Sequence, residues 1–167
     1  MVRSIEDFRN AWNYESSATE KVFSYLSKES LDQRVSPEGR SIRDLAWHIV
    51  LTLVEMPGGA GLEVEGPDYN TPAPDSPEEI SRIYHATSER LLESVGANWN
   101  DEKLNDRLTM YGQDWWTYGM VLGALIDHQI HHRAQITVLM RQAGLRVPGV
   151  YGPSREEWIE MGREALA

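Results

Sequence analysis

The sequence contains no cysteine, few basic residues and no long hydrophobic run, and each of these features excludes some kinds of site or partner. Without cysteine there is no disulfide, no thiolate nucleophile and no sulfur ligand, so any metal site must use nitrogen and oxygen donors. The 16 basic residues are outnumbered by 26 acidic ones, which gives a net charge of -10. Because phosphate backbones bind clustered lysine and arginine, nucleic acid is a poor candidate partner.

The lack of long apolar runs also argues against a membrane protein. The first ten residues are too charged for a signal peptide, and the longest apolar-rich run, 45–54, is interrupted by His48 and Thr52. We therefore expect a cytoplasmic protein with no membrane partner. At 167 residues, the chain is expected to form a single domain over 1–167 and to bury a core without a structural metal. A bound metal would then serve function rather than folding.

Four long segments carry apolar residues at helical spacing, over about 4–27, 42–56, 77–95 and 117–143. The first three begin at the preferred N-cap residues Ser4, Ser41 and Ser76, and the last ends at Gly144, a preferred C-cap residue.

The remaining segments predict connections. Residues 57–75 hold four of the eight prolines and are expected to form a long crossover loop. Residues 97–116 show no clear pattern beyond one helical turn near 101–104, and Ser154 with Glu157 predicts a short C-terminal helix. The sequence therefore predicts an all-α fold, a four-helix bundle with no strand.

Three of the five histidines fall on faces that we expect to be buried. His128 and His132 are four residues apart, so their side chains project from one helix face, and His48 lies on the core side of the second helix. A buried histidine is often only a hydrogen-bonded core residue. Three imidazoles that converge from facing helices would instead form a metal site with an open position, the pattern of catalytic sites.

Neighbouring residues exclude some metal proteins. A di-iron bundle needs Glu-x-x-His pairs, but Leu45 and Leu125 stand three residues before His48 and His128. A zinc protease of the His-Glu-x-x-His type needs glutamate at position 129, where this chain has Gln129. We expect His131 to lie beside the site or on the surface, and His85 to be an exposed helix residue without a role.

The segment Asp127-His128-Gln129-Ile130-His131-His132-Arg133-Ala134-Gln135, with Leu45-Ala46-Trp47-His48 upstream, resembles the DinB family of DinB/YfiT-like proteins over most of the chain. The resemblance implies a four-helix bundle, often a homodimer, in which His48, His128 and His132 bind a metal. Many members have glycine in place of Ala134, at a position that points away from the ligands. Relatives include thiol S-transferases that use bacillithiol or mycothiol, a mycothiol-dependent isomerase, proteins described as metal-dependent hydrolases and members without known activity.

Three functions remain open. The leading hypothesis is an enzyme whose divalent metal, zinc or nickel, activates a low-molecular-weight thiol for transfer to an electrophilic small molecule. The second is a metal-dependent hydrolase, for which Glu55, seven residues after His48, is a candidate base and Asp114 and Asp127 are weaker ones; no catalytic residue is assigned. The third is a non-catalytic metal-binding or ligand-binding module.

Two further groups are expected to have supporting roles. In the non-catalytic module, the aromatic cluster of Trp115, Trp116 and Tyr118 at the start of the last long helix would pack the bundle or a dimer contact. We interpret Arg133 and Gln135 as polar residues that support the helix or the ligands.

Overall fold

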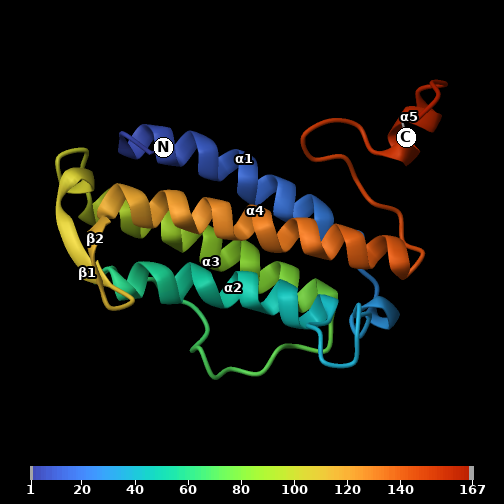
Figure 1. Cartoon of the computed structure of the whole chain (residues 1–167), viewed down its shortest axis with the longest axis horizontal. Coiled ribbons are helices and arrows are strands. Elements are labelled where there is room, and N and C mark those ends of the chain that lie inside the picture. The colour runs from blue at the N-terminus through green and yellow to red at the C-terminus, as the bar shows by residue number, and fades with distance from the viewer. Residues whose placement is uncertain (1, 166–167) are drawn as a thin grey trace.

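The computed structural model describes residues 2–165, and four long helices form its body (Figure 1). Helices α1 (Ile5–Phe23), α2 (Ile42–Gly59), α3 (Pro77–Asn98) and α4 (Tyr118–Gln142) lie side by side, and a long crossover joins α2 to α3. The short helix α5 (Arg155–Glu160) follows a loop that leads away from the end of α4. The predicted four-helix bundle, crossover loop and short C-terminal helix are thus confirmed.

Polar caps begin the helices where the sequence predicts them. The side chain of Ser4 accepts a hydrogen bond from the backbone N–H of Asp7 at 3.0 Å. Reciprocal capping boxes join Ser41 to Asp44 and Ser154 to Glu157, and each satisfies N–H groups that a helix start leaves without partners. Gly144 follows α4 with a φ of 72°, a left-handed conformation that glycine adopts without steric cost.

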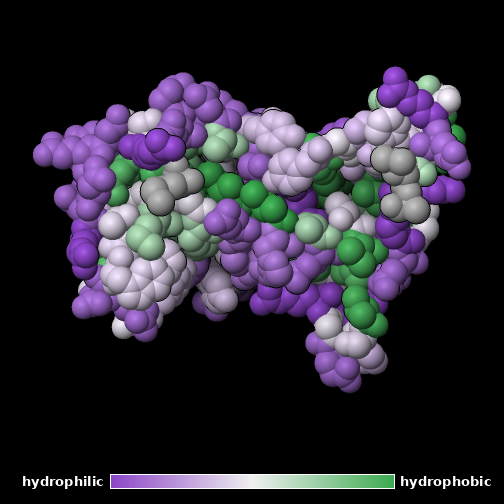
Figure 2. Space-filling model, turned by 45° about the horizontal axis from the view of Figure 1, so that its top comes forward, coloured by the Kyte–Doolittle hydropathy of each residue, from purple (hydrophilic) through white to green (hydrophobic). Residues whose placement is uncertain are grey.

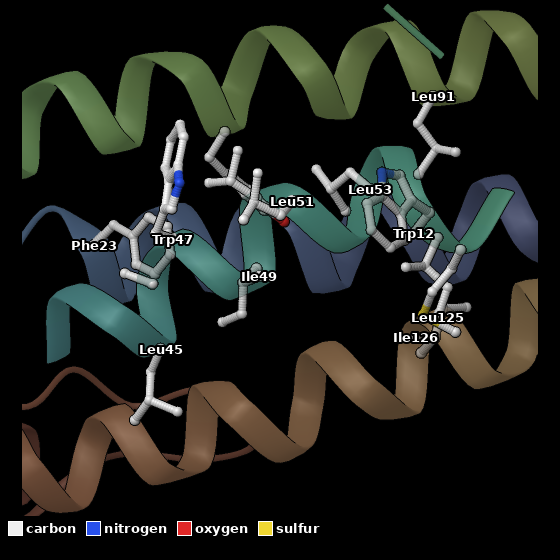
Figure 3. Close-up of a cluster of buried hydrophobic side chains, with 14 of the residues drawn as sticks. Trp12, Phe23, Leu45, Trp47, Ile49, Leu51, Leu53, Leu91, Leu125 and Ile126 are labelled. Carbon is white, nitrogen blue, oxygen red and sulfur yellow. The ribbon is translucent and has the colours of Figure 1, made fainter. Parts of the chain in front are cut away.

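Apolar side chains from all four helices meet in one core (Figure 3). Trp12 of α1 is fully buried, and its indole N–H donates to the hydroxyl of Ser88 in α3 at 2.9 Å. Burying a large apolar side chain contributes roughly 1.5–3 kcal/mol, so the core is the main force that aligns the helices. Other residues with no exposed surface include Phe8, Ile49, Leu53, Ile80, Leu91 and Leu125.

Two helix ends lie beyond their predicted positions. Helix α2 does not stop before Pro57 but continues to Gly59, because the carbonyl of Pro57 accepts hydrogen bonds from Ala60 and Leu62, both at 2.9 Å. Helix α3 likewise runs past Gly96. The first helix is shorter than predicted and ends at Phe23, and the 3-10 helix η1 (Lys28–Ser30) occupies part of the following connection.

The prediction that the chain contains no strand was wrong. After the 3-10 helix η2 (Lys103–Asn105), strands β1 (Arg107–Met110) and β2 (Gln113–Thr117) form an antiparallel hairpin at one end of the bundle (Figure 1). Strands of four and five residues are too short to show a clear alternation in sequence. Trp115 and Trp116 therefore lie on β2, and only Tyr118 of the aromatic cluster begins a helix.

The face of the molecule shown in Figure 2 is mostly hydrophilic, with hydrophobic residues in a strip near its middle and in a patch towards the right. This distribution agrees with the net charge of -10. Within residues 2–165, none of the helices combines the length and apolar character that a bilayer crossing needs.

Candidate metal centre

Two neighbouring helices carry the three histidines. His48 lies on α2 between the buried residues Leu45 and Ile49, and His128 and His132 lie one turn apart on α4. Helices α2 and α4 pack directly against each other in the bundle (Figure 1). The imidazoles of the two helices therefore meet in the space between them, as the sequence predicts.

The ring nitrogens converge at distances that suit one metal ion. The Nε2 atom of His128 lies 3.2 Å from Nε2 of His48 and 3.1 Å from Nε2 of His132, and one nitrogen from each ring lies within 4.8 Å of the others. Nitrogens bound at about 2.0–2.1 Å to a tetrahedral zinc ion are roughly 3.3–3.4 Å apart. The three side chains thus fit a metal ion that they would hold from one side.

Their environment keeps the three imidazoles neutral. Burial, the charge of Arg40 and the other two imidazoles lower the pKa of His48 to about 4. Burial, followed by the charges of the neighbouring histidines, lowers the pKa of His128 to about 4. Burial also lowers the pKa of His132. At neutral pH each ring therefore offers an unprotonated nitrogen, which is the form that binds metals.

Gln135 fixes the orientation of one ring. Its side-chain oxygen lies 2.7 Å from Nδ1 of His132, and because an amide oxygen only accepts, Nδ1 carries the proton and Nε2 is left free. The amide nitrogen of Gln135 donates to Nε2 of His131 at 3.1 Å. His131 therefore lies beside the site, as expected, and is linked to His132 through Gln135. The buried Nδ1 of His128 has no hydrogen-bond partner among residues 2–165.

A cavity of about 540 Å³ opens beside His48 and His128. We call it the Glu55 cavity; its lining residues are His48, Thr52, Glu55, Met56, Tyr69, Tyr111 and His128. Glu55 is half-buried there, at the position that made it a candidate base. Both other candidate carboxylates, Asp114 and Asp127, are exposed and do not line this cavity.

Sequence reasoning missed Tyr111, which the β-hairpin places over this cavity. Its hydroxyl lies 3.1 and 3.0 Å from the two carboxylate oxygens of Glu55, to which it donates. Burial and the charge of Glu55 raise the pKa of Tyr111 to about 12, so the phenol remains a donor at neutral pH. Its φ of 52° is uncommon for a residue other than glycine. The available signal was the Tyr111-Gly112 pair, which suits a tight hairpin turn.

The other residues singled out in the sequence lie outside the centre. His85 is exposed, as expected, and pairs with Glu20 at 2.7 Å. Arg133 is buried and forms an ion pair with Glu15 of α1, so it supports the helix packing. The rings of the two hairpin tryptophans stack with centroids 4.7 Å apart.

Comparison with known proteins gives consistent results over nearly the whole chain. The model of the DinB family matches residues 1–164. The uncharacterized protein YrdA of Bacillus subtilis (strain 168) is 38% identical over 165 residues, which cover 99% of this chain and 98% of the relative.

Two solved structures resemble the fold. The crystal structure of a DinB-like protein from Bacillus cereus ATCC 10987 is 38% identical, with a TM-score of 0.85 over 90% of this chain and 100% of that one. A DinB-like protein of Bacillus subtilis, YjoA, is 17% identical, with a TM-score of 0.59 over 87% of this chain and 96% of that one. The second likeness concerns the fold alone.

Proposed function

The chain belongs to the DinB family, and we propose that His48, His128 and His132 bind one divalent metal ion, zinc or nickel, to activate a small-molecule nucleophile. The observation that carries the proposal is that Nε2 of His128 lies 3.2 Å from that of His48 and 3.1 Å from that of His132, close to the ligand spacing of a tetrahedral site. Calcium and magnesium prefer oxygen ligands, whereas imidazole suits zinc and nickel.

The donor set favours catalysis over a purely structural role. Three protein ligands leave a position for a fourth ligand, and the Glu55 cavity gives small molecules access to the site. When bound, the ion would supply a Lewis acid that lowers the pKa of a coordinated thiol or water. A chain of 167 residues with one apolar core across all four helices is large enough to be stable without a structural metal.

We propose thiol S-transfer as the reaction. Because the chain has no cysteine, the thiol must come from a cosubstrate of low molecular weight. Its sulfur would form a bond to an electrophilic carbon of the second substrate, the leaving group would depart with the bonding electrons, and the thiol proton would pass to solvent. Within the protein, Gln135 holds His132 in the tautomer that this ligand set requires.

Metal analysis is the first test. Elemental analysis of protein purified without an affinity tag or added metal should give close to one equivalent of zinc or nickel. The double variant His128→Ala, His132→Ala should lose it, and the exposed His85→Ala should keep it as a matched control. Absence of metal in the wild type, even after incubation with zinc and nickel, would contradict the proposal.

The second test concerns the reaction. Metal-loaded protein should accelerate the conjugation of chlorodinitrobenzene with a cellular thiol, and the double histidine variant should not. If no common cellular thiol is conjugated faster than in buffer, thiol transfer is not the function.

One observation favours a hydrolase as the alternative. Glu55 lies in the same cavity as two of the histidines, where it could accept a proton from an attacking water. A hydrolase should cleave an activated ester without any thiol, and Glu55→Gln should abolish that activity while metal content is unchanged. Metal binding with neither activity would indicate a non-catalytic binding module.

A further inference from the structure

A second cavity, of about 360 Å³, lies on the other side of the histidine cluster. We call it the Arg40 cavity; it is lined by Val35, Gly39, Arg40, Leu45, His132, Gln135, Val138 and Leu139. It contains His132 and Gln135, whereas the Glu55 cavity contains His48 and His128, and no residue lines both. The histidine cluster is therefore open to two separate spaces. A volume of this size suits a small organic molecule.

The walls of the Arg40 cavity are mainly apolar, with one cation. Leu45 and Leu139 are buried beneath it, and Val35 and Val138 are 73% and 55% exposed at its rim. Among its lining residues, only Arg40 carries a fixed charge. A ligand that fills this space would meet aliphatic surface and one guanidinium group.

Arg40 is exposed, and within the described part of the chain its guanidinium has no protein partner. Its neighbour Arg43 is paired with Asp32 and Asp75, but Arg40 forms no ion pair or side-chain hydrogen bond with any residue between 2 and 165. Arg40 shares this cavity with His132, so a ligand bound to its guanidinium would lie beside that histidine.

The two cavities carry opposite charges. Glu55 would repel an anion from its cavity, whereas Arg40 offers an unpaired planar cation that can bind a carboxylate through two hydrogen bonds. An anionic ligand of the metal would therefore approach from the Arg40 side. A neutral or electron-poor second substrate could use the Glu55 side without charge repulsion.

We propose that the Arg40 cavity selects the thiol cosubstrate, which carries a carboxylate that Arg40 binds while its sulfur reaches the centre beside His132. This inference rests on the proposed function and adds the chemical class of the thiol. The aliphatic wall would contact the carbon chain between the sulfur and the carboxylate. Arg40 is thus a specificity residue rather than a metal ligand.

The test uses cobalt(II) as a spectroscopic metal in the full-length protein. Thiolate binding to cobalt produces a charge-transfer absorption that can be titrated with each thiol. The main probes are 3-mercaptopropionate and its uncharged isostere 3-mercaptopropanamide. Mercaptoacetate and 4-mercaptobutyrate vary the distance between the sulfur and the carboxylate. We expect the wild type to bind the best carboxylate thiol roughly tenfold more tightly than the amide, as one charge-assisted hydrogen-bonded pair would give.

Substitution of Arg40 tests whether its charge affects thiol binding independently of metal binding. Arg40→Met should remove the preference for the carboxylate and leave the affinities for the amide and for cobalt unchanged. The matched control is Arg34→Met in the same loop, where Arg34 makes only long hydrogen bonds of 3.4 Å to the carbonyls of Asp32 and Pro37. This control should keep the full preference.

The outcomes distinguish this inference from the function on which it rests. If cobalt does not bind, the metal centre itself is wrong. If cobalt and the thiols bind but the wild type shows no preference for the carboxylate, or Arg40→Met retains the preference, then Arg40 does not select the thiol and the metal proposal stands. Loss of the preference in Arg34→Met as well would also overturn the inference, since any loop cation would then have the same effect.

Discussion

Replacing Arg133 with methionine should destabilise the bundle far more than the loss of a surface ion pair would. Arg133 follows a histidine of the centre on α4, and its side chain is 3% exposed. Its guanidinium donates to the backbone carbonyl of Glu15 at 2.9 Å, to the hydroxyl of Thr19 at 3.2 Å and to the carboxylate of Glu15 at 2.5 Å. It also donates to the hydroxyl of Tyr151 at 2.8 Å, which ties the C-terminal segment to α1 and α4.

The loss of folding free energy can be estimated from the buried charge that the substitution leaves unpaired. The side chain of Glu15 is only 10% exposed, so without Arg133 its charge would be buried with the hydroxyl of Tyr151 as its remaining side-chain partner. Breaking a buried ion pair in this way typically costs about 3–5 kcal/mol. In a chain of this size, each kcal/mol lowers Tm by about 2–4 °C, so we expect a fall of roughly 6–20 °C.

Urea and thermal unfolding of the metal-free protein measure this effect without a contribution from ligand binding. The matched control is Arg141→Met, also on α4, which breaks the more exposed pair with Glu156 of α5 and should cost less than about 1 kcal/mol. The double variant Glu15→Leu, Arg133→Met should be more stable than the single arginine variant, because no charge is then left unpaired. A cost for Arg133→Met no larger than that of the control would refute the reasoning and show that water reaches the pair.

Further predictions concern the centre, the surface and the crossover. Gln135→Leu removes the acceptor that fixes the tautomer of its histidine, so competition with a chromophoric chelator should show metal affinity roughly 10–100-fold weaker. The glutamate partner raises the pKa of His85, so the pair stabilises the fold below about pH 6.5 and its contribution is lost as pH rises through the folded-state pKa. Because that side chain is 62% exposed, unfolding of His85→Gln at several pH values should show a loss below about 1 kcal/mol, confined to the acidic side. Gly66→Ala would place its Cβ 2.6 Å from a methyl of Val54 and 2.9 Å from that of Thr87, so chemical unfolding should show a destabilisation of about 1–3 kcal/mol.

The fold could be predicted wherever a regular period and a cap occurred together. The stripe on α4 that includes Val121, Leu125, Ile136 and Leu139 is buried as the spacing predicts, and the serine caps begin α1, α2 and α3. Pro57 misled the prediction of the end of α2, because a proline removes one N–H donor while its carbonyl can still close the last turn. The sequence did not predict the hairpin, because its register depends on a two-residue turn rather than on a long periodic pattern of apolar residues.

The residues of the candidate site also differ in how well the sequence predicts them. The three histidines lie on helices, where the direction of a side chain follows from its position in the 3.6-residue repeat. The sequence alone could therefore predict that His48, His128 and His132 lie close together. Tyr111 and Arg40 lie in connections, where direction depends on turns that the sequence specifies only weakly. Gln135, interpreted from the sequence as a supporting polar residue, lies three residues after His132 on the same face of α4 and contacts its ring.

The helices and the connections contribute differently to the centre. Packed helices hold the three histidines at fixed spacing, while the segment around Arg40 and the hairpin around Tyr111 each contribute one wall of a cavity. Loops tolerate exchange more readily than a core does, because fewer buried contacts depend on them. We therefore expect replacement of residues 34–40 by a neutral loop of equal length to change which thiol binds while cobalt affinity stays the same. A parallel loss of cobalt affinity would show instead that the loop helps to hold the histidines in place.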